Sequence, residues 1–224
     1  MASAHGIDLS SYQHVKGINW DALGKSRYRV LIAKLTEGTG HQQYSIALQH
    51  GQEARRRGWD FTVYHFMDRD IRFKAKDEAR WFLNNFHFIK HLCTLPPALD
   101  VEPAGTGNAW GGKQTTLTRT GLGAWCKEWS DAVGFAPMLY YSAGRSFVPA
   151  ITAACPLSPR WAASRPWRVS ANVDAPPDEP GWTKTPQGAD VWQYASRCEG
   201  VPGIKGNCDR NLVRDVAALR RRWQ

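Results

Sequence analysis

The stretch that decides the fold is Pro97–Glu102, with the sequence PALDVE. It begins as a short apolar run of the kind that forms a strand, and it ends in two acids, Asp100 and Glu102. An acidic side chain in an apolar strand is unfavourable unless it is paired or functional. In α/β folds ligands bind where the strands end. We therefore expect this run to be a strand whose last residues reach a functional site.

Short β-rich runs alternate with amphipathic stretches along the whole chain, which indicates β/α units around a largely parallel sheet. We expect strands at Gly6–Ser10, Arg29–Thr36, Asp60–Phe66, Pro97–Glu102, Pro137–Ser142, Arg160–Ala163 and Val191–Ala195. We expect helices at Ser45–Arg57, Arg72–Ile89, Thr115–Val133, Ser146–Ala153 and Leu212–Arg222. Ser164–Gly188 should be a long loop with at most one short strand. The pattern predicts an α/β fold, an irregular (β/α) TIM-like barrel, with an open doubly wound sheet as the alternative.

The composition is that of an ordinary soluble globular protein. The chain has 224 residues, of which 42% are hydrophobic and 22% are charged, and it contains no repeat or low-complexity linker. We expect residues 1–224 to form a single domain with its core at 5–212. The longest apolar runs are strand-sized, and a bilayer-spanning helix needs about 18 apolar residues, so we expect no membrane insertion. The first residues lack the basic and apolar segments of a signal peptide.

The net charge of +9 favours a polyanionic partner, such as nucleic acid, anionic lipid, or a cell wall with phosphate and carboxylate groups. A nucleic-acid or phosphoryl-transfer function is disfavoured, because the chain has no Walker motif and Gly105–Gly107 opens no phosphate-binding loop of the usual spacing. The chain has 11 tryptophans, whose flat faces suit core packing and also suit stacking on sugars. Together with a cluster of carboxylates, this abundance indicates a carbohydrate ligand.

The five cysteines form no C-x-x-C pair, so zinc-ribbon spacing is absent. Cys198 and Cys208 flank a loop and could form a disulfide across a hairpin, or they could be two small buried residues; the sequence leaves both open. His87, His91 and Cys93 lie at helical spacing, which favours surface or core histidines over a metal site. We expect no metal and no cofactor.

Polar and aromatic side chains gather where the expected strands end, as the rule for α/β folds requires. The candidate site residues are Asp8, Glu37, Tyr64, Asp100, Glu102, Tyr140, Trp192, Gln193 and Asp209.

Asp100 and Glu102 are the most informative pair. Residues two apart in a strand point to the same face, so both carboxyls should project into one cavity. Two such close carboxylates cannot both ionise easily, and the pKa of one is raised. A glutamic acid with a raised pKa beside an ionised aspartate is what glycoside hydrolysis requires, since one donates a proton and the other stabilises positive charge in the transition state. The alternative is a carboxylate pair that binds a basic partner or a divalent metal.

Several collinear motifs resemble glycoside hydrolase family 25, the muramidases of bacteria, fungi and phages often called Chalaropsis-type lysozymes. The resemblance runs from Gly6 to about Leu212. Its motifs are Gly6–Gln13, Ile18–Trp20, Lys34–Gly38, Tyr64–Phe66, Leu99–Glu102, Trp192–Tyr194, Gly203–Ile204 and Asp209–Asn211. The sequence departs from the family pattern at Ser164, where an aromatic residue is common, and at Cys208, where an apolar residue is usual.

The resemblance implies an irregular β/α barrel that cleaves the β-1,4 bond between N-acetylmuramic acid and N-acetylglucosamine in bacterial peptidoglycan. It implies Glu102 as the general acid with Asp100 beside it, while Asp8 and Asp209 complete an acidic cleft. Tyr64 and Tyr140 would line the subsite for muramic acid. Trp192, Gln193 and Glu37, at the other strand ends, are further candidates for substrate binding.

Two mechanisms fit these residues. In the favoured one, the 2-acetamido group of the substrate attacks the anomeric carbon while Asp100 orients it and Glu102 protonates the leaving oxygen. In the other, Asp8 or Asp209 activates water for direct attack with inversion. A barrel that binds cell walls without catalysis is the rival function, although binding alone does not require clustered acids that repel one another.

The biological context follows from the charge and from the absence of a leader and a linker. A basic surface would hold the enzyme on an anionic wall without a separate cell-wall-binding domain. We expect a monomeric phage endolysin that is made in the host cytoplasm and acts on the wall after release. An extracellular enzyme whose leader has been removed is the alternative.

Overall fold

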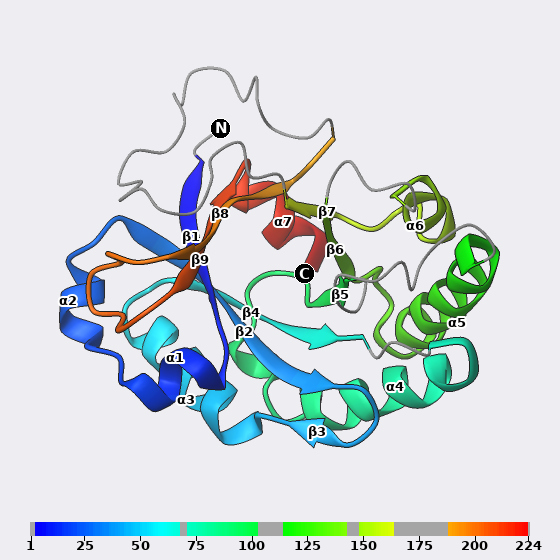
Figure 1. Cartoon of the computed structure of the whole chain (residues 1–224), viewed down its shortest axis with the longest axis horizontal. Coiled ribbons are helices and arrows are strands. Elements are labelled where there is room, and N and C mark those ends of the chain that lie inside the picture. Colours follow the sequence, from blue (N-terminus) through cyan, green and yellow to red (C-terminus); the bar gives the residue numbers. More distant parts are fainter. Residues whose placement is uncertain (1–2, 68–70, 103–113, 143–147, 164–187, 224) are drawn as a thin grey trace.

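A computed structural model of the chain describes residues 3–67, 71–102, 114–142, 148–163 and 188–223 (Figure 1). The strands are β1 (Ala4–Leu9), β2 (Tyr28–Glu37), β3 (His41–Gln42), β4 (Asp60–Phe66), β5 (Ala98–Val101), β6 (Met138–Ser142), β7 (Arg160–Ala163), β8 (Val191–Cys198) and β9 (Cys208–Val213). The helices are α1 (Ser11–Lys16), α2 (Trp20–Gly24), α3 (Tyr44–Arg56), α4 (Ile71–Phe86), the 3-10 turn η1 (Lys90–Leu92), α5 (Gln114–Val133), α6 (Val148–Ala154) and α7 (Val216–Trp223).

The sheet closes into a barrel. Its strand order is β1-β9-β8-β7-β6-β5-β4-β2, and a further pairing of β1 with β2 joins the two ends. Strand β9 runs antiparallel to both of its neighbours, β1 and β8, while the other neighbours in the ring are parallel. The short strand β3 forms a hairpin with β2 outside the ring. The closure confirms the predicted irregular barrel and excludes the open doubly wound sheet.

Alternation along the strands separates an outer core from the barrel interior. On β2, Leu31, Ala33 and Leu35 belong to the large outer core, whereas Val30 and Ile32 belong to a second cluster. This second cluster contains alternate residues of β2 and of strands β4 to β9, which identifies it as the filling of the barrel. Apolar side chains therefore occupy one end of the interior, and the polar residues that follow them on the same face reach the other end.

The helices cover the outside of the sheet (Figure 1). Helix α3 contacts β2 and β4, α4 lies against β2 and α5, and α6 packs on α5. Aromatic rings fill the layer beneath them, with Phe82 of α4 stacked 5.1 Å from Trp129 of α5 and Trp125 stacked 5.9 Å from Trp129. Both tryptophans are fully buried, so they serve core packing and not sugar binding.

The seven predicted strands all coincide with observed strands, and the largest differences lie near the C-terminus. The expected helix at Leu212–Arg222 is wrong at its start, because Leu212 and Val213 end strand β9 and α7 begins at Val216. Strand β9 escaped prediction because its sequence, CDRNLV, is mostly polar. Its polar residues are nevertheless buried, with Arg210 and Asn211 fully inaccessible. Asn211 bonds Asp8 of β1 and Trp161 of β7, and Arg210 donates to the carbonyl oxygen of Glu199, just after β8.

Two short helices were also not predicted. Helix α1 has a capping box, in which the Ser10 side chain accepts from the backbone of the first turn and Gln13 accepts from the backbone N–H of Ser10. Helix α2 is capped by Asn19, whose side chain accepts from the backbone N–H of Ala22. Both helices are too short to show a hydrophobic period in the sequence.

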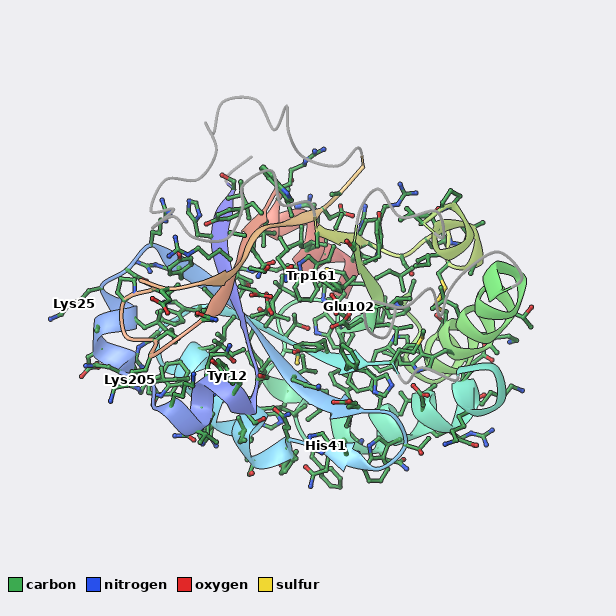
Figure 2. All side chains as sticks on the ribbon, viewed as in Figure 1. Tyr12, Lys25, His41, Glu102, Trp161 and Lys205 are labelled. Atoms are coloured by element: carbon green, nitrogen blue, oxygen red, sulfur yellow. A yellow bond between two sulfur atoms is a disulfide. The ribbon has the colours of Figure 1, made fainter. Side chains whose placement is uncertain are left out.

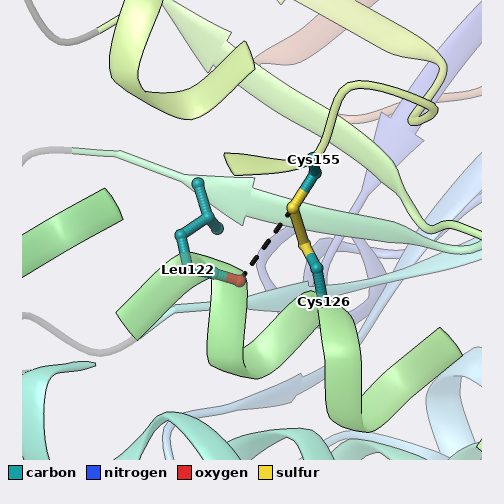
Figure 3. Close-up of a disulfide and its surroundings, with 3 residues drawn as sticks. All are labelled: Leu122, Cys126 and Cys155. Atoms are coloured by element: carbon teal, nitrogen blue, oxygen red, sulfur yellow. Dashed lines mark hydrogen bonds between the residues drawn. A yellow bond between two sulfur atoms is a disulfide. The ribbon is translucent and has the colours of Figure 1, made fainter. Parts of the chain in front are cut away.

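A disulfide that no local pattern predicts joins Cys126 of α5 to Cys155, just after α6 (Figure 3). It joins two segments 29 residues apart and ties the α5–α6 pair together. Cys198 and Cys208 are register partners on β8 and β9, so the predicted hairpin brings their backbones together. The thiol of Cys208 is buried against the carbonyl oxygens of Asp8 and Asp209, at 3.7 and 3.6 Å. The side chain of Cys198 lies outside the described residues, so both alternatives for this pair stay predictions.

No helix in the described ranges has the length and apolar character needed to cross a membrane.

Candidate active site

The predicted acidic residues meet at the end of the barrel where the parallel strands finish. Asp8 lies near the end of β1, Asp100 is in β5, and Glu102 follows that strand. Asp209 reaches the same end from the beginning of β9, because β9 runs the other way and pairs Asp209 directly with Asp8. Figure 2 shows Glu102 near the middle of the molecule, whereas Tyr12, Lys25, His41 and Lys205 lie around its outside.

Asp100 is the most deeply buried of these carboxyls, with 8% of the residue exposed. Burial raises its pKa well above the ordinary value, and the charges of Glu102, Asp8 and Asp209 raise it further, while Lys34 opposes them. The sequence predicts the raised pKa on the glutamate of this pair, but the structure raises the pKa of the more deeply buried Asp100 instead. Its Oδ1 accepts no hydrogen bond from the described residues. An unpartnered buried carboxyl oxygen is unfavourable in a structural role.

Asp8 is half-buried, and the described residues bind it on one oxygen only. Its Oδ2 accepts hydrogen bonds from Nδ2 of Asn211 at 2.8 Å and from Nε2 of Gln193 at 3.3 Å. Burial raises the pKa of Asp8 to about 8, and the charge of Asp209 contributes to the rise, whereas the two amide hydrogen bonds lower it. Asp8 therefore holds a proton at neutral pH.

Three aromatic side chains form one wall beside the carboxyls. Trp161 of β7 lies with its ring 4.6 Å from that of Tyr140 and 6.3 Å from that of Tyr64, in edge-on geometry. Tyr64 and Tyr140 are buried. Burial and the charges of all four acids raise the pKa of Tyr64 well above its usual range, so its hydroxyl stays protonated and can donate. Aromatic faces beside acids are suited to holding a sugar ring.

The ammonium group of Lys34 lies at the edge of the cluster of carboxyls. Lys34, on the same face of β2 as the barrel-filling residues, forms an ion pair with Glu37, whose side chain is 44% exposed. The ammonium of Lys34 also lies 4.6 Å from the ring centre of Phe66. Glu37 thus lies next to the site through Lys34, which is the cation that acts on Asp100.

The structure separates one predicted site residue from the others. Trp192 is buried and packs its ring 5.9 Å from that of Tyr194, in a cluster with Ala195 and Leu212. Its neighbour Gln193 faces the carboxyls, and successive side chains of a strand point to opposite faces. Trp192 therefore lies on the outer face of β8, away from the acids.

Sequence reasoning also missed three residues of the site, namely Asn211, Trp161 and Lys34. Asn211 could have been found, because it lies two residues after Asp209 and shares its face of β9. Lys34 could have been found in the same way from the alternation of β2. The position of Trp161 beside Asn211, with its indole N–H 2.8 Å from the amide oxygen, depends on contacts between distant segments.

The arrangement can hold a proton and stabilise positive charge at the same end of the barrel. A coupled carboxyl pair retains one proton between its members, and the other carboxyl can then stabilise an oxocarbenium-like transition state. Among the described residues, no group of three or more His, Cys, Asp or Glu side chains is arranged to hold a metal ion. The chemistry that these side chains can perform is acid-assisted cleavage of a glycosidic bond.

Comparisons with known proteins agree with this geometry. The N,O-diacetylmuramidase of Chalaropsis sp. is 30% identical over 145 residues, which are 62% of this chain and 65% of that protein. The match thus spans slightly less than two thirds of the length of the Chalaropsis relative.

Solved structures share the fold over nearly the whole chain. The bacterial lysozyme from Streptomyces coelicolor has a TM-score of 0.72 at 24% identity, with 98% of this chain and 96% of that chain covered. The catalytic domain of endolysin ply40 from bacteriophage P40 of Listeria monocytogenes has a TM-score of 0.65 at 18% identity, with 98% of each chain covered. Residues 7–204 match the glycosyl hydrolases family 25. The chain is therefore a member of glycosyl hydrolase family 25, as its motifs predicted.

Proposed function

We propose that the protein is an N-acetylmuramidase that hydrolyses the β-1,4 bond between N-acetylmuramic acid and N-acetylglucosamine in bacterial peptidoglycan. The observation that carries this proposal is the buried Asp100, whose pKa burial and the neighbouring charge of Glu102 raise at the end of the barrel. Membership of family 25 and the muramidase activity named for the Chalaropsis relative support the substrate. The net charge of +9 supports attraction to an anionic wall.

Glu102 acts as the general acid and Asp100 as its partner. Glu102 protonates the leaving glycosidic oxygen while the 2-acetamido oxygen of the substrate attacks the anomeric carbon, and Asp100 accepts the acetamido N–H. Glu102 then takes a proton from the water that opens the resulting ring, so the product retains the β configuration.

The competing mechanism uses Asp8 or Asp209 as a base for direct attack by water, with inversion. The raised pKa of Asp8, about 8, disfavours Asp8 in this role, because a protonated carboxyl cannot accept a proton from water at neutral pH. Tyr64, Tyr140 and Gln193 contact the sugar in either mechanism, and Glu37 contacts the outer part of the substrate.

Residues 5–212 form one catalytic domain that works as a monomer and without a cofactor. The phage origin of the endolysin structure with the same fold supports a phage endolysin, made in the host cytoplasm and active on the wall after release. An extracellular enzyme is the second context, favoured by the Cys126–Cys155 disulfide, since disulfides persist in oxidising compartments.

Digestion of purified peptidoglycan tests the bond and the mechanism together. Mass spectrometry with and without borohydride reduction should find fragments that end in reducible N-acetylmuramic acid, and proton NMR should show the β-anomer first. Fragments ending in N-acetylglucosamine would show that the enzyme cleaves the other glycosidic bond of the glycan. An initial α-anomer would exclude substrate assistance. No release from several wall types, with binding retained, would favour the non-catalytic barrel.

A further inference from the structure

The hydrogen bonds around Asp8 form a chain in which each amide can be placed in only one orientation. On one side, the indole N–H of Trp161 lies 2.8 Å from Oδ1 of Asn211. An indole nitrogen can only donate, so the oxygen of Asn211 must face Trp161. The amide nitrogen of Asn211 therefore faces Asp8, where it lies 2.8 Å from Oδ2.

Gln193 is oriented in the same way from the other side. Its Nε2 lies 3.3 Å from Oδ2 of Asp8 and 3.3 Å from Oδ2 of Asp209, so one N–H can be directed to each carboxyl. Its Oε1 accepts a hydrogen bond from the hydroxyl of Tyr140 at 2.9 Å. If the amide were turned round, its oxygen would face two carboxyl oxygens, which is unfavourable when either of them is ionised.

This arrangement distinguishes the two oxygens of Asp8. Both amides donate to Oδ2, and within the described part of the chain no hydrogen bond reaches Oδ1. An oxygen that already accepts two N–H groups is a poor place for a proton, because the proton would point at another hydrogen. When Asp8 is protonated, the proton must therefore lie on Oδ1.

The charges that face Asp8 favour this protonated form. Asp209 on β9 and Glu102 after β5 are the acids that raise its pKa, and burial adds to their effect. Asp100 and Tyr64 face it from β5 and β4. The cation of this cluster, Lys34 on β2, is paired with Glu37.

We propose that Asn211 and Gln193 are positioning residues, oriented by Trp161 and Tyr140, that hold Asp8 by Oδ2 and leave Oδ1 as a hydrogen-bond donor to a substrate oxygen. Asp8 then serves as a neutral acid that binds the sugar and takes no part in activating water. This inference deepens the proposed function and rests on it for the identity of the sugar.

The test uses two variants of the network and one matched control. Asn211→Ala removes the donor to Asp8, and Trp161→Phe keeps an aromatic ring but frees Asn211 to turn its oxygen toward Asp8. Trp125→Phe is the control, because the Trp125 indole nitrogen is buried without a hydrogen-bond partner among the described residues. It makes the same substitution at a buried position away from Asp8.

The readout is the ¹³C NMR titration of the Asp8 carboxyl carbon in protein labelled at aspartate, assigned with Asp8→Asn. Because the amide hydrogen bonds favour the ionised carboxylate, Asn211→Ala should move the titration midpoint upward by roughly one pH unit, and Trp161→Phe should move it upward by less. Trp125→Phe should leave it unchanged. An unchanged midpoint in both network variants, or an equal shift in the control, would overturn the proposal.

Kinetics separate this proposal from the proposed function. Asn211→Ala should lower kcat on soluble peptidoglycan fragments by roughly 10-fold with little change in KM, since a misplaced catalytic-site group chiefly affects the transition state. Full activity of Asp8→Ala, which lacks both carboxyl oxygens, would remove Asp8 from the reaction, whereas the titration would still decide whether Asn211 and Trp161 position its carboxyl.

Discussion

Both ends of the barrel carry buried aspartates, but the neighbours of these aspartates differ in charge. At the end where the parallel strands begin, Asp60 accepts two hydrogen bonds from Arg220 of α7, at 2.7 and 2.8 Å, and a third from Thr94. Asp190, just before β8, accepts from the backbone N–H of Arg160 and lies 3.5 Å from Arg222. At the end where those strands finish, Asp8 and Asp100 face other acids instead.

This difference shows that the partners of a buried carboxyl, and not the carboxyl itself, decide its role. Bidentate pairing with an arginine satisfies both oxygens of Asp60 and fixes α7 on the barrel. Asp100 keeps an oxygen without a partner among the described residues and meets repulsion, which is unfavourable for folding but keeps a proton available for chemistry. The paired end is built for stability and the crowded end for reaction.

The largest effect expected at the crowded end is on catalysis. Glu102→Gln keeps the shape of the side chain but removes the proton donor, so kcat on peptidoglycan should fall by about 10²–10⁴-fold. The melting temperature should stay within a few degrees, and circular dichroism should be unchanged. A variant with near-normal turnover would refute the role of Glu102.

The paired end should respond in the opposite sense. Asp60→Asn leaves Arg220 with a weaker partner, and the free energy of unfolding should fall by about 1–3 kcal/mol, below the full effect for a buried pair because the Arg220 side chain is 48% exposed. Urea denaturation measures this loss, while kcat should not change. Asp21→Asn is the control, since Asp21 is 86% exposed in its pair with Arg57 and should alter stability little. Loss of kcat without loss of stability would contradict the comparison.

The smallest effect concerns the pH dependence of stability. The folded protein holds the Asp8 proton up to a pKa of about 8, whereas the unfolded chain releases it near 3.8. Between these values the folded state binds more protons, so stability is highest at the acidic side and falls as the pH rises from about 4 to 8. Asp8→Asn should flatten this slope and raise stability at pH 8 by about 1–2 kcal/mol, because Asp8 is partly exposed.

Chemical denaturation of the wild type and of Asp8→Asn at several pH values measures this slope. If both proteins lost stability equally between pH 4 and 8, the folded protein would not hold an extra proton on Asp8, and the raised pKa of Asp8 would be refuted. Adding Asp60→Asn to both proteins should leave the difference between their stability–pH slopes unchanged, because Asp60 lies at the opposite end of the barrel from Asp8.

The sequence predicted the parallel strands well because many of them are local apolar runs that end in polar residues, as in Pro97–Glu102 and Pro137–Ser142. It predicted β9 poorly, since the residues of that strand are polar and their burial depends on β1 and β8. The disulfide had no local signal, because the meeting of Cys126 and Cys155 depends on how α5 packs against α6. The prediction that Trp192 lies beside the acids was wrong for a similar reason. Alternation assigns the residues of β8 to two faces, but the strand sequence does not show which face lines the barrel.

The sequence by itself determined the family, the order of the strands along the chain and the acids that would meet at one end of the sheet. These follow from local properties, since alternation within a strand sets the face of each side chain and parallel strands end together. Only the tertiary structure decided which partner each acid meets. Asn211 reaches Asp8 from 203 positions away and Arg220 reaches Asp60 from 160 positions away. Burial and pairing between such distant residues control protonation, and no local pattern encodes them.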